Sequence, residues 1–182
     1  TSNRASWAAD GFDLYSFGGT SMKTYNAAGD NYTGITSTLN SFDPAAGGYM
    51  TFIRGNRAAT MVTSPVSSTT LRTTGQLFTG DQPAITLVPG QFIPVNNPYA
   101  SQIDLRSLSQ SASIFYYVWD PNMSSTIGYG AFRTFSWNGT DYDVTPANAG
   151  SYGATNNFIC SGQAFLVAGT GPPLQITEKA KT

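Results

Sequence analysis

Turn-forming residues recur along most of the chain, roughly every eight to twelve positions, and this spacing constrains the fold more than any other feature. Glycine, proline, asparagine and aspartate supply the backbone angles that tight reversals need. Between the turns lie short segments rich in β-branched and aromatic residues. Regularly spaced short strands are typical of sandwiches and barrels. The pattern predicts an all-β protein, a two-sheet antiparallel β-sandwich of the jelly-roll type.

The middle of the chain carries the clearest strand signals. Residues 114–119 are apolar at every position, which predicts a central strand covered on both faces, with Trp119 in the core. Residues 129–137 predict a second strand. The Asn138-Gly139 pair that follows is typical of a two-residue hairpin turn, so residues 142–144 are expected to pair with that strand.

The first third of the chain has a weaker pattern. Residues 12–17 and 22–25 each fit a strand, whereas residues 26–42 are rich in Asn, Ser, Thr and Gly and predict mostly loop. A strand is expected again at residues 49–54. Residues 1–47 are therefore the part of the fold that the sequence defines least.

One short helix is predicted, near residues 101–108. Ser101 followed three positions later by Asp104 resembles a capping box, in which both side chains bind free amides of the first turn. Leu105 and Leu108 supply apolar side chains to bury. We expect one or two helical turns here, and further strands at residues 71–78, 85–88, 92–95, 157–159, 164–168 and 174–177.

Length and composition bound the class of protein. The 182 residues fit one domain, predicted over residues 1–182. Charged residues make up 10% of the chain, against about 25% in an average protein, which favours a secreted, extracellular β protein. The chain begins with Thr1, and no apolar run approaches the length of a membrane span. We therefore expect a fragment of a larger secreted protein without a membrane span.

The same composition weighs against several functions. The net charge is −1 and basic residues are scattered singly, so nucleic acid is not an expected partner. The chain has no histidine and one cysteine, which leaves no Ser/His/Asp or Cys/His relay and too few zinc ligands. The lone Cys160 is expected to be a small buried apolar residue beside Ile159. No catalytic residue, metal or cofactor is assigned.

Two acidic features have a chemical and a structural interpretation. Asp141 and Asp143 occupy alternate positions and would share a strand face, as a glycosidase pair requires, but the favoured interpretation is two solvated acids beside a turn. Asp120-Pro121-Asn122 and residues 10–13 could lend oxygens to calcium. Neither has the ligand density of a calcium loop, and turn capping is preferred for both.

Aromatic rings near turns are the candidate binding residues. A ring at such a place can stack on the apolar face of a sugar while neighbouring Asn and Asp bind its hydroxyls. The alternative is that these rings fill the core, as most aromatic residues of a β protein do. The candidates are Trp137, Tyr142, Tyr129 and Tyr152.

Five segments occur in an order and rough spacing that match a known protein region. They are Gly48 to Arg57, Thr70 to Gly75, Asn97-Pro98-Tyr99-Ala100-Ser101 with Ile103-Asp104, Tyr117-Val118-Trp119-Asp120-Pro121-Asn122, and Gly162 to Val167. Together they resemble a region of large surface proteins that Bacteroidota-type bacteria export through the type IX secretion system. Asn56, where the family often has Asp, and Asn96, where it often has Gly, depart from that pattern.

The resemblance implies a β-sandwich module of a secreted or cell-surface protein and carries no catalytic residues. Our first hypothesis is a non-enzymatic structural or adhesion module, as one unit of a multi-domain or self-assembling array. Its expected partners are other domains of the parent protein, or neighbouring copies joined through an edge strand. The alternative is a carbohydrate-binding module that tethers an enzyme or the cell to polysaccharide. A hydrolase that uses Asp141 and Asp143 is a third, weaker hypothesis.

Overall fold

The computed structural model describes residues 20–35, 47–53, 76–123, 130–147 and 157–182. Their regular structure is strands joined by turns, with two 3-10 helices of three residues each, which confirms the all-β prediction. The chain divides into two compact units, Thr1–Gln76 and Leu77–Thr182. The expected single domain stays a prediction.

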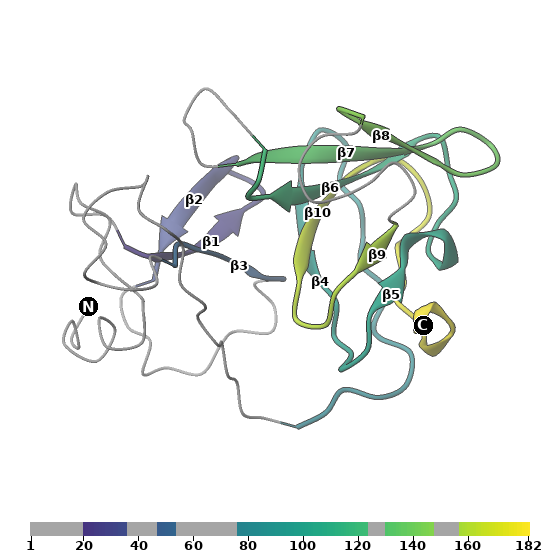
Figure 1. The fold of residues 1–182 in the computed structure, drawn as a ribbon, viewed down its shortest axis with the longest axis horizontal. Helices are drawn as coiled ribbons and strands as arrows, with labels where there is room; N and C mark the ends of the chain where they lie inside the picture. Colours follow the sequence, from purple (N-terminus) through teal and green to yellow (C-terminus); the bar gives the residue numbers. More distant parts are fainter. Residues whose placement is uncertain (1–19, 36–46, 54–75, 124–129, 148–156) are drawn as a thin grey trace. The chain divides into compact units, whose positions relative to one another are not determined.

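The described part of the first unit contains one antiparallel sheet of three strands. Its order is β2-β1-β3, with β1 at Met22–Asn26, β2 at Asn31–Gly34 and β3 at Tyr49–Thr51 (Figure 1). The strands predicted at residues 22–25 and from residue 49 are confirmed, although β3 ends at Thr51. The loop predicted over residues 26–42 is wrong at β2.

A side-chain-stabilised turn explains why a polar segment forms β2. Asn26 Oδ1 accepts hydrogen bonds from the amides of Ala28 and Gly29, at 3.1 and 3.2 Å. The Tyr25 hydroxyl donates to Asp30 Oδ1 at 2.5 Å, and burial together with this bond raises the pKa of Tyr25 to about 12. The Tyr25 and Tyr32 rings meet edge to face at 5.2 Å. Local contacts at the turn therefore fix this hairpin without a buried apolar face on β2.

The second unit is built on an antiparallel sheet of five strands in the order β4-β10-β6-β7-β8. The strands are β4 (Ile93–Asn96), β6 (Ile114–Asp120), β7 (Ala131–Trp137), β8 (Tyr142–Thr145) and β10 (Ala164–Gly169). β6 lies in the middle and pairs with β10 on one side and β7 on the other. The prediction of a central strand at residues 114–119 is confirmed.

The two faces of β6 differ in burial. Ile114, Tyr116 and Val118 are completely buried on one face. Phe115, Tyr117 and Trp119 are half-buried on the other. Trp119 packs edge to face against Phe132 at 5.1 Å, so it belongs to the packed structure without being fully covered.

A second layer covers the buried face of the five-stranded sheet. It includes the short antiparallel pair β5 (Ile103–Asp104) and β9 (Phe158–Ile159), which lie side by side (Figure 1). Tyr99, Leu174 and Ile176 belong to the same apolar cluster. This packing gives the sandwich-like architecture that the turn spacing predicts.

The predicted short helix exists, but its cap differs from the prediction. The 3-10 helix η2 covers Leu105–Ser107, and Asp104 caps it by accepting a hydrogen bond from the Arg106 amide at 2.9 Å. Ser101 is not the cap, because residues 103–104 pair with β9 and the helical turn begins after them. The second such helix, η3, covers Glu178–Ala180.

The hairpin predicted at Asn138-Gly139 is confirmed and joins β7 to β8. The Asn138 amide donates to the Asp141 carbonyl at 3.0 Å. Asn138 Oδ1 accepts from the amides of Thr140 and Asp141, each at 3.0 Å. Gly139 has a φ of 103°, which glycine adopts without steric cost.

Several predicted strands are shorter or absent. Residues 85–88 and 174–177 contribute one isolated bridge, Ile85 to Leu174, instead of two strands. In the predicted strand 71–78, residues 76–78 are not a strand and residues 71–75 lie outside the described ranges, as do residues 12–17. In the part of the chain that the structure describes, no helix has the length and apolar character needed to cross a membrane.

Candidate functional site

The predicted binding rings are placed differently from one another. Trp137 is half-buried at the end of β7 and meets Tyr142 edge to face at 5.2 Å. Tyr142 is 3% exposed, so its ring cannot stack on a sugar, and that interpretation of Tyr142 is wrong. Its position on the inward face of β8 explains the burial. Tyr129 and Tyr152 lie outside the described residues.

Two buried phenols converge on one backbone carbonyl. The hydroxyl groups of Tyr116 and Tyr142 donate to the carbonyl of Ser109, at 3.1 and 3.0 Å. Burial raises the pKa of Tyr142 to about 12 and raises the pKa of Tyr116 as well. Both therefore stay protonated near neutral pH and act as hydrogen-bond donors, tying the segment after η2 to the sheet.

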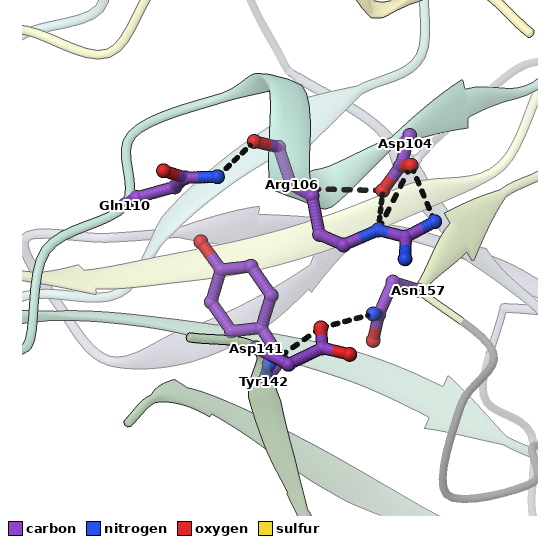
Figure 2. Close-up of polar contacts among 6 residues, drawn as sticks. All are labelled: Asp104, Arg106, Gln110, Asp141, Tyr142 and Asn157. Atoms are coloured by element: carbon purple, nitrogen blue, oxygen red, sulfur yellow. Dashed lines mark hydrogen bonds and ion pairs between the residues drawn. The ribbon is translucent and has the colours of Figure 1, made fainter. Parts of the chain in front are cut away.

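Beside Tyr142 lies a polar cluster formed by Asp104, Arg106, Asp141 and Asn157 (Figure 2). The Arg106 guanidinium binds the Asp104 carboxylate through Nε, at 3.0 Å to each oxygen, and through Nη2 at 2.8 Å. The hydrogen bond to Asp104 is the main reason that the pKa of Arg106 is raised. Arg106 also lies 5.8 Å from the centre of the Phe158 ring.

Asn157 connects the backbone of η2 to the β7–β8 hairpin. Its Nδ2 donates to Asp141 Oδ1 at 2.9 Å, and the Tyr142 amide donates to the same oxygen at 2.8 Å. Its backbone carbonyl accepts from the Leu105 amide at 2.9 Å. Asn157 is 1% exposed, and its Oδ1 has no hydrogen-bond partner in the described structure.

The charged and amide groups of this cluster bind one another and nearby backbone amides. Its two carboxylates already accept several hydrogen bonds, and its one cation is bound to a carboxylate. Asp143 is exposed and accepts from Asn138 Nδ2 at 2.8 Å, so Asp141 and Asp143 bind different amides. That geometry favours the structural interpretation of the two acids over the glycosidase one.

The calcium interpretation of Asp120-Pro121-Asn122 finds a structural alternative in place. Asp120 is completely buried and its Oδ1 accepts from the Asn122 amide at 3.0 Å, which is the expected turn capping. Over the described ranges, no group of three or more His, Cys, Asp or Glu side chains is placed to hold a metal. Residues 10–13 lie outside those ranges.

Asn97, the residue before Pro98, is a second polar junction. Its Nδ2 donates to the carbonyls of Ser101, Ile159 and Cys160, at 2.8, 3.1 and 3.1 Å. Its Oδ1 accepts from the Tyr99 amide at 3.0 Å. At 2% exposure, Asn97 both closes its own turn and binds the end of β9.

Tyr99 and the last residues form a third junction. The Tyr99 hydroxyl lies 2.8 Å from the Gly80 carbonyl and 3.2 Å from that of Ile176, and can donate to either. Lys181 Nζ lies 4.3 Å from the centre of the Tyr99 ring and pairs with Glu178. Glu178 also accepts from the Gly80 amide at 2.5 Å. Residues 174–182 are thereby bound to residues 80–85.

Cys160 corrects an expectation. It is exposed, with a free thiol, although a buried position beside Ile159 was predicted. The reason is that β9 ends at Ile159 and Cys160 opens a turn, in which its carbonyl accepts from the Gln163 amide at 3.0 Å.

The sequence indicates the role of some of these junction residues and not of others. Asn97 precedes a proline, which indicates a turn but does not show which distant carbonyls the side chain binds. Asn157 carries no local signal, because its partners Asp141 and Leu105 are distant along the chain. No family model, curated protein or solved structure matches this chain.

Proposed function

We propose that this chain is a non-catalytic structural or adhesion module of a secreted cell-surface protein. The observation that carries the proposal is that its buried polar side chains join backbone segments far apart in the sequence. Asn97 binds the end of β9, Asn157 binds the β7–β8 hairpin, and Tyr99 binds the C-terminal segment. A module that holds other parts of a surface protein in place needs such cross-connections more than it needs reactive groups.

The acidic residues support the same proposal. In the polar cluster of Figure 2, both oxygens of Asp104 and Oδ1 of Asp141 accept hydrogen bonds from an arginine, an asparagine and backbone amides. A general acid or nucleophile needs an oxygen directed at a substrate. Low overall charge and the resemblance to type IX-exported surface proteins support the surface location.

Bead attachment tests the proposal. The exposed Cys160 thiol allows the chain to be coupled to fluorescent beads in one orientation through maleimide chemistry. We expect these beads to attach to bacterial surfaces or to glass under flow several times more often than beads that carry a protein of equal size.

Two controls make the result decisive. Beads coated with a Phe135→Asp chain, which places an unpaired charge in the core so that the module does not fold, should attach no better than blank beads if the folded module is required. Equal attachment of folded and disrupted chains would contradict adhesion. Turnover of a glycan or peptide by the chain that one point substitution abolishes would contradict the non-catalytic role.

A second candidate is a carbohydrate-binding module, and one observation favours it. Trp137 keeps part of its ring exposed beside the hairpin, where Asn138 and Asp143 supply polar groups. The buried Tyr142 ring packs against Trp137 and holds it in place. A partly exposed, fixed ring next to amide and carboxylate groups suits stacking on a sugar.

Affinity electrophoresis on a panel of polysaccharides tests this candidate. If the chain binds sugar through Trp137, its migration should be retarded in at least one polysaccharide gel, and Trp137→Ala should migrate without this retardation. Trp119→Ala is the matched control, because it removes a half-buried ring from the same sheet and should leave retardation unchanged. Absence of retardation on every polysaccharide ends this candidate.

A further inference from the structure

The outer edge of β2 is an open strand edge in the described structure. β2 ends the order β2-β1-β3, and its residues Asn31, Tyr32 and Thr33 are exposed. The Ile35 amide donates to the Met22 carbonyl, which places the odd-numbered amides of β2 toward β1. Because the pattern alternates, the amide and carbonyl of Tyr32 and Gly34 point away from the sheet.

In contrast to β2, both edge strands of the five-stranded sheet carry features that hinder pairing with another strand. In β4, the Asn97 amide donates to the Gln163 carbonyl, so the backbone groups of the even-numbered residues point away from β10. One of these residues is Pro94, which has no N–H to offer to another strand. In β8, the outward Tyr142 amide is bound by its neighbour Asp141, and Pro146 follows the strand. Natural sheets use such devices against unwanted pairing. β2 carries neither a proline nor a charged residue.

We propose that β2 pairs antiparallel with β2 of a second copy of this chain, about a two-fold axis through Thr33. In this register Tyr32 lies opposite Gly34 of the second copy, and the two Thr33 residues lie opposite each other. All four outward backbone groups of each copy then find partners, giving four hydrogen bonds. A shift of two residues toward the turn would need Asp30, which has left strand geometry with a φ of 46°.

The side chains suit this register. The Tyr32 ring, 37% exposed, faces a glycine across the pair, and an aromatic ring opposite a glycine is a stabilising arrangement. The Thr20 side chain lies where a Gly34 Cβ would project, so the ring would meet its methyl and hydroxyl groups. Two threonines opposite each other also pair favourably, and no like charges face each other.

The pairing deepens the proposed structural role, because it names the surface through which copies would join, and in that respect it rests on that role. Its test is nevertheless separate. If the chain dimerises but beads coated with it do not attach to a surface, only the adhesion proposal is contradicted. If the chain is a monomer but beads coated with it do attach, only the β2 pairing is contradicted.

Disulfide trapping tests the register directly. In a Cys160→Ser background, Thr33→Cys places two thiols across a non-hydrogen-bonded pair, where Cα atoms lie about 4.5 Å apart and a disulfide fits. Asn31→Cys is the matched control, because position 31 lies opposite position 35 and its two copies are about 13 Å apart along the strand. We expect a covalent dimer from Thr33→Cys at least ten times faster than from Asn31→Cys. Equal rates, or no dimer from either, would overturn the proposal.

A charge exchange tests the same axis without a covalent bond. Thr33→Lys alone and Thr33→Asp alone place like charges opposite each other and should weaken the dimer about fivefold, while an equimolar mixture should restore it. Sedimentation equilibrium of the 182-residue chain, at concentrations up to about 1 mM to reach weak interfaces, measures each case. A monomer throughout this range overturns the proposal, as does a dimer that both variants leave unchanged.

Discussion

The three-stranded sheet of the first unit and the five-stranded sheet of the second are held together in different ways. β6 buries Ile114, Tyr116 and Val118 completely, whereas β2 has no buried residue. The larger sheet is specified by apolar side chains that leave water. The smaller hairpin depends on a turn in which Asn26 and Asp30 bind nearby groups.

The same difference applies to their edges. The larger sheet ends in a proline-bearing strand on one side and a self-bound amide on the other, while β2 leaves two amides and two carbonyls directed outward. Burial and edge protection therefore occur together in one sheet and are both missing from β2. A strand that gains little from its own core is the one best suited to gain stability from a partner.

The strongest way to break this comparison is to remove a core ring from the larger sheet. Phe135 is 1% exposed on β7. We expect Phe135→Ala to lower the free energy of unfolding by about 3–5 kcal/mol, because it loses buried area and leaves a cavity. Urea denaturation followed by tryptophan fluorescence measures this. Thr134→Ala, on the less buried face of the same strand, is the control and should cost about 1 kcal/mol or less.

The next largest effect should come from the Asn97 junction. Asn97→Ala removes the donor shared by three carbonyls and leaves buried carbonyls unpaired, at a cost of about 2–3 kcal/mol in the free energy of unfolding. Asn97→Asp keeps the acceptor for the Tyr99 amide but loses the donor. If it is as destabilising as Asn97→Ala, the donor side carries the effect. A wild-type stability for Asn97→Asp would contradict that role.

The sequence predicted the larger sheet better than the smaller one for a physical reason. Strands with a buried face carry an apolar pattern, and residues 114–119 and the Asn138-Gly139 hairpin were placed correctly from it. β2 has no buried face and therefore no such pattern, so residues 31–34 were predicted as loop. The formation of β2 depends on the Asn26 side chain, and an asparagine occurs as readily in a loop as at the end of a strand, so it does not predict one.

The candidate site was harder to predict than the fold. Tyr142 lies near a turn, and closeness to a turn does not determine which side of a strand faces the core. Asp104 was predicted to take part in a capping box and became the cap itself, because Ile103 and Asp104 pair with β9 and the helical turn begins after them. Contacts between distant segments decided both cases, and a single sequence does not report them.

A smaller effect sharpens the comparison by making one chemical change in both sheets. Tyr142→Phe removes a buried donor to the Ser109 carbonyl and should cost about 1 kcal/mol in the free energy of unfolding. Tyr25→Phe removes a hydroxyl from the exposed hairpin and should cost about 0.5 kcal/mol or less. Urea denaturation of the two variants measures the difference. A larger cost for Tyr25→Phe would mean that the hairpin turn contributes more than burial does.

The smallest expected effect concerns an exposed contact near the C-terminal end of the second unit. The hydrogen bond from Lys181 is the main cause of the lowered pKa of Glu178, which also accepts from the Gly80 amide. Because the pKa of Glu178 in the folded chain lies below the ordinary value of 4.5, the stabilisation by its carboxylate is present above about pH 4.5 and disappears as the pH falls through the folded pKa.

Glu178→Gln should therefore be slightly less stable than the wild type at pH 7 and equal to it at low pH. Thermal denaturation of both chains between pH 7 and pH 3 checks this, because solvent-exposed ion pairs contribute little and titrate away. If the difference in stability between the two chains persists unchanged at the lowest pH, the Glu178 carboxylate does not act through its charge. The C-terminal segment would then be held by packing, as the buried part of the larger sheet is.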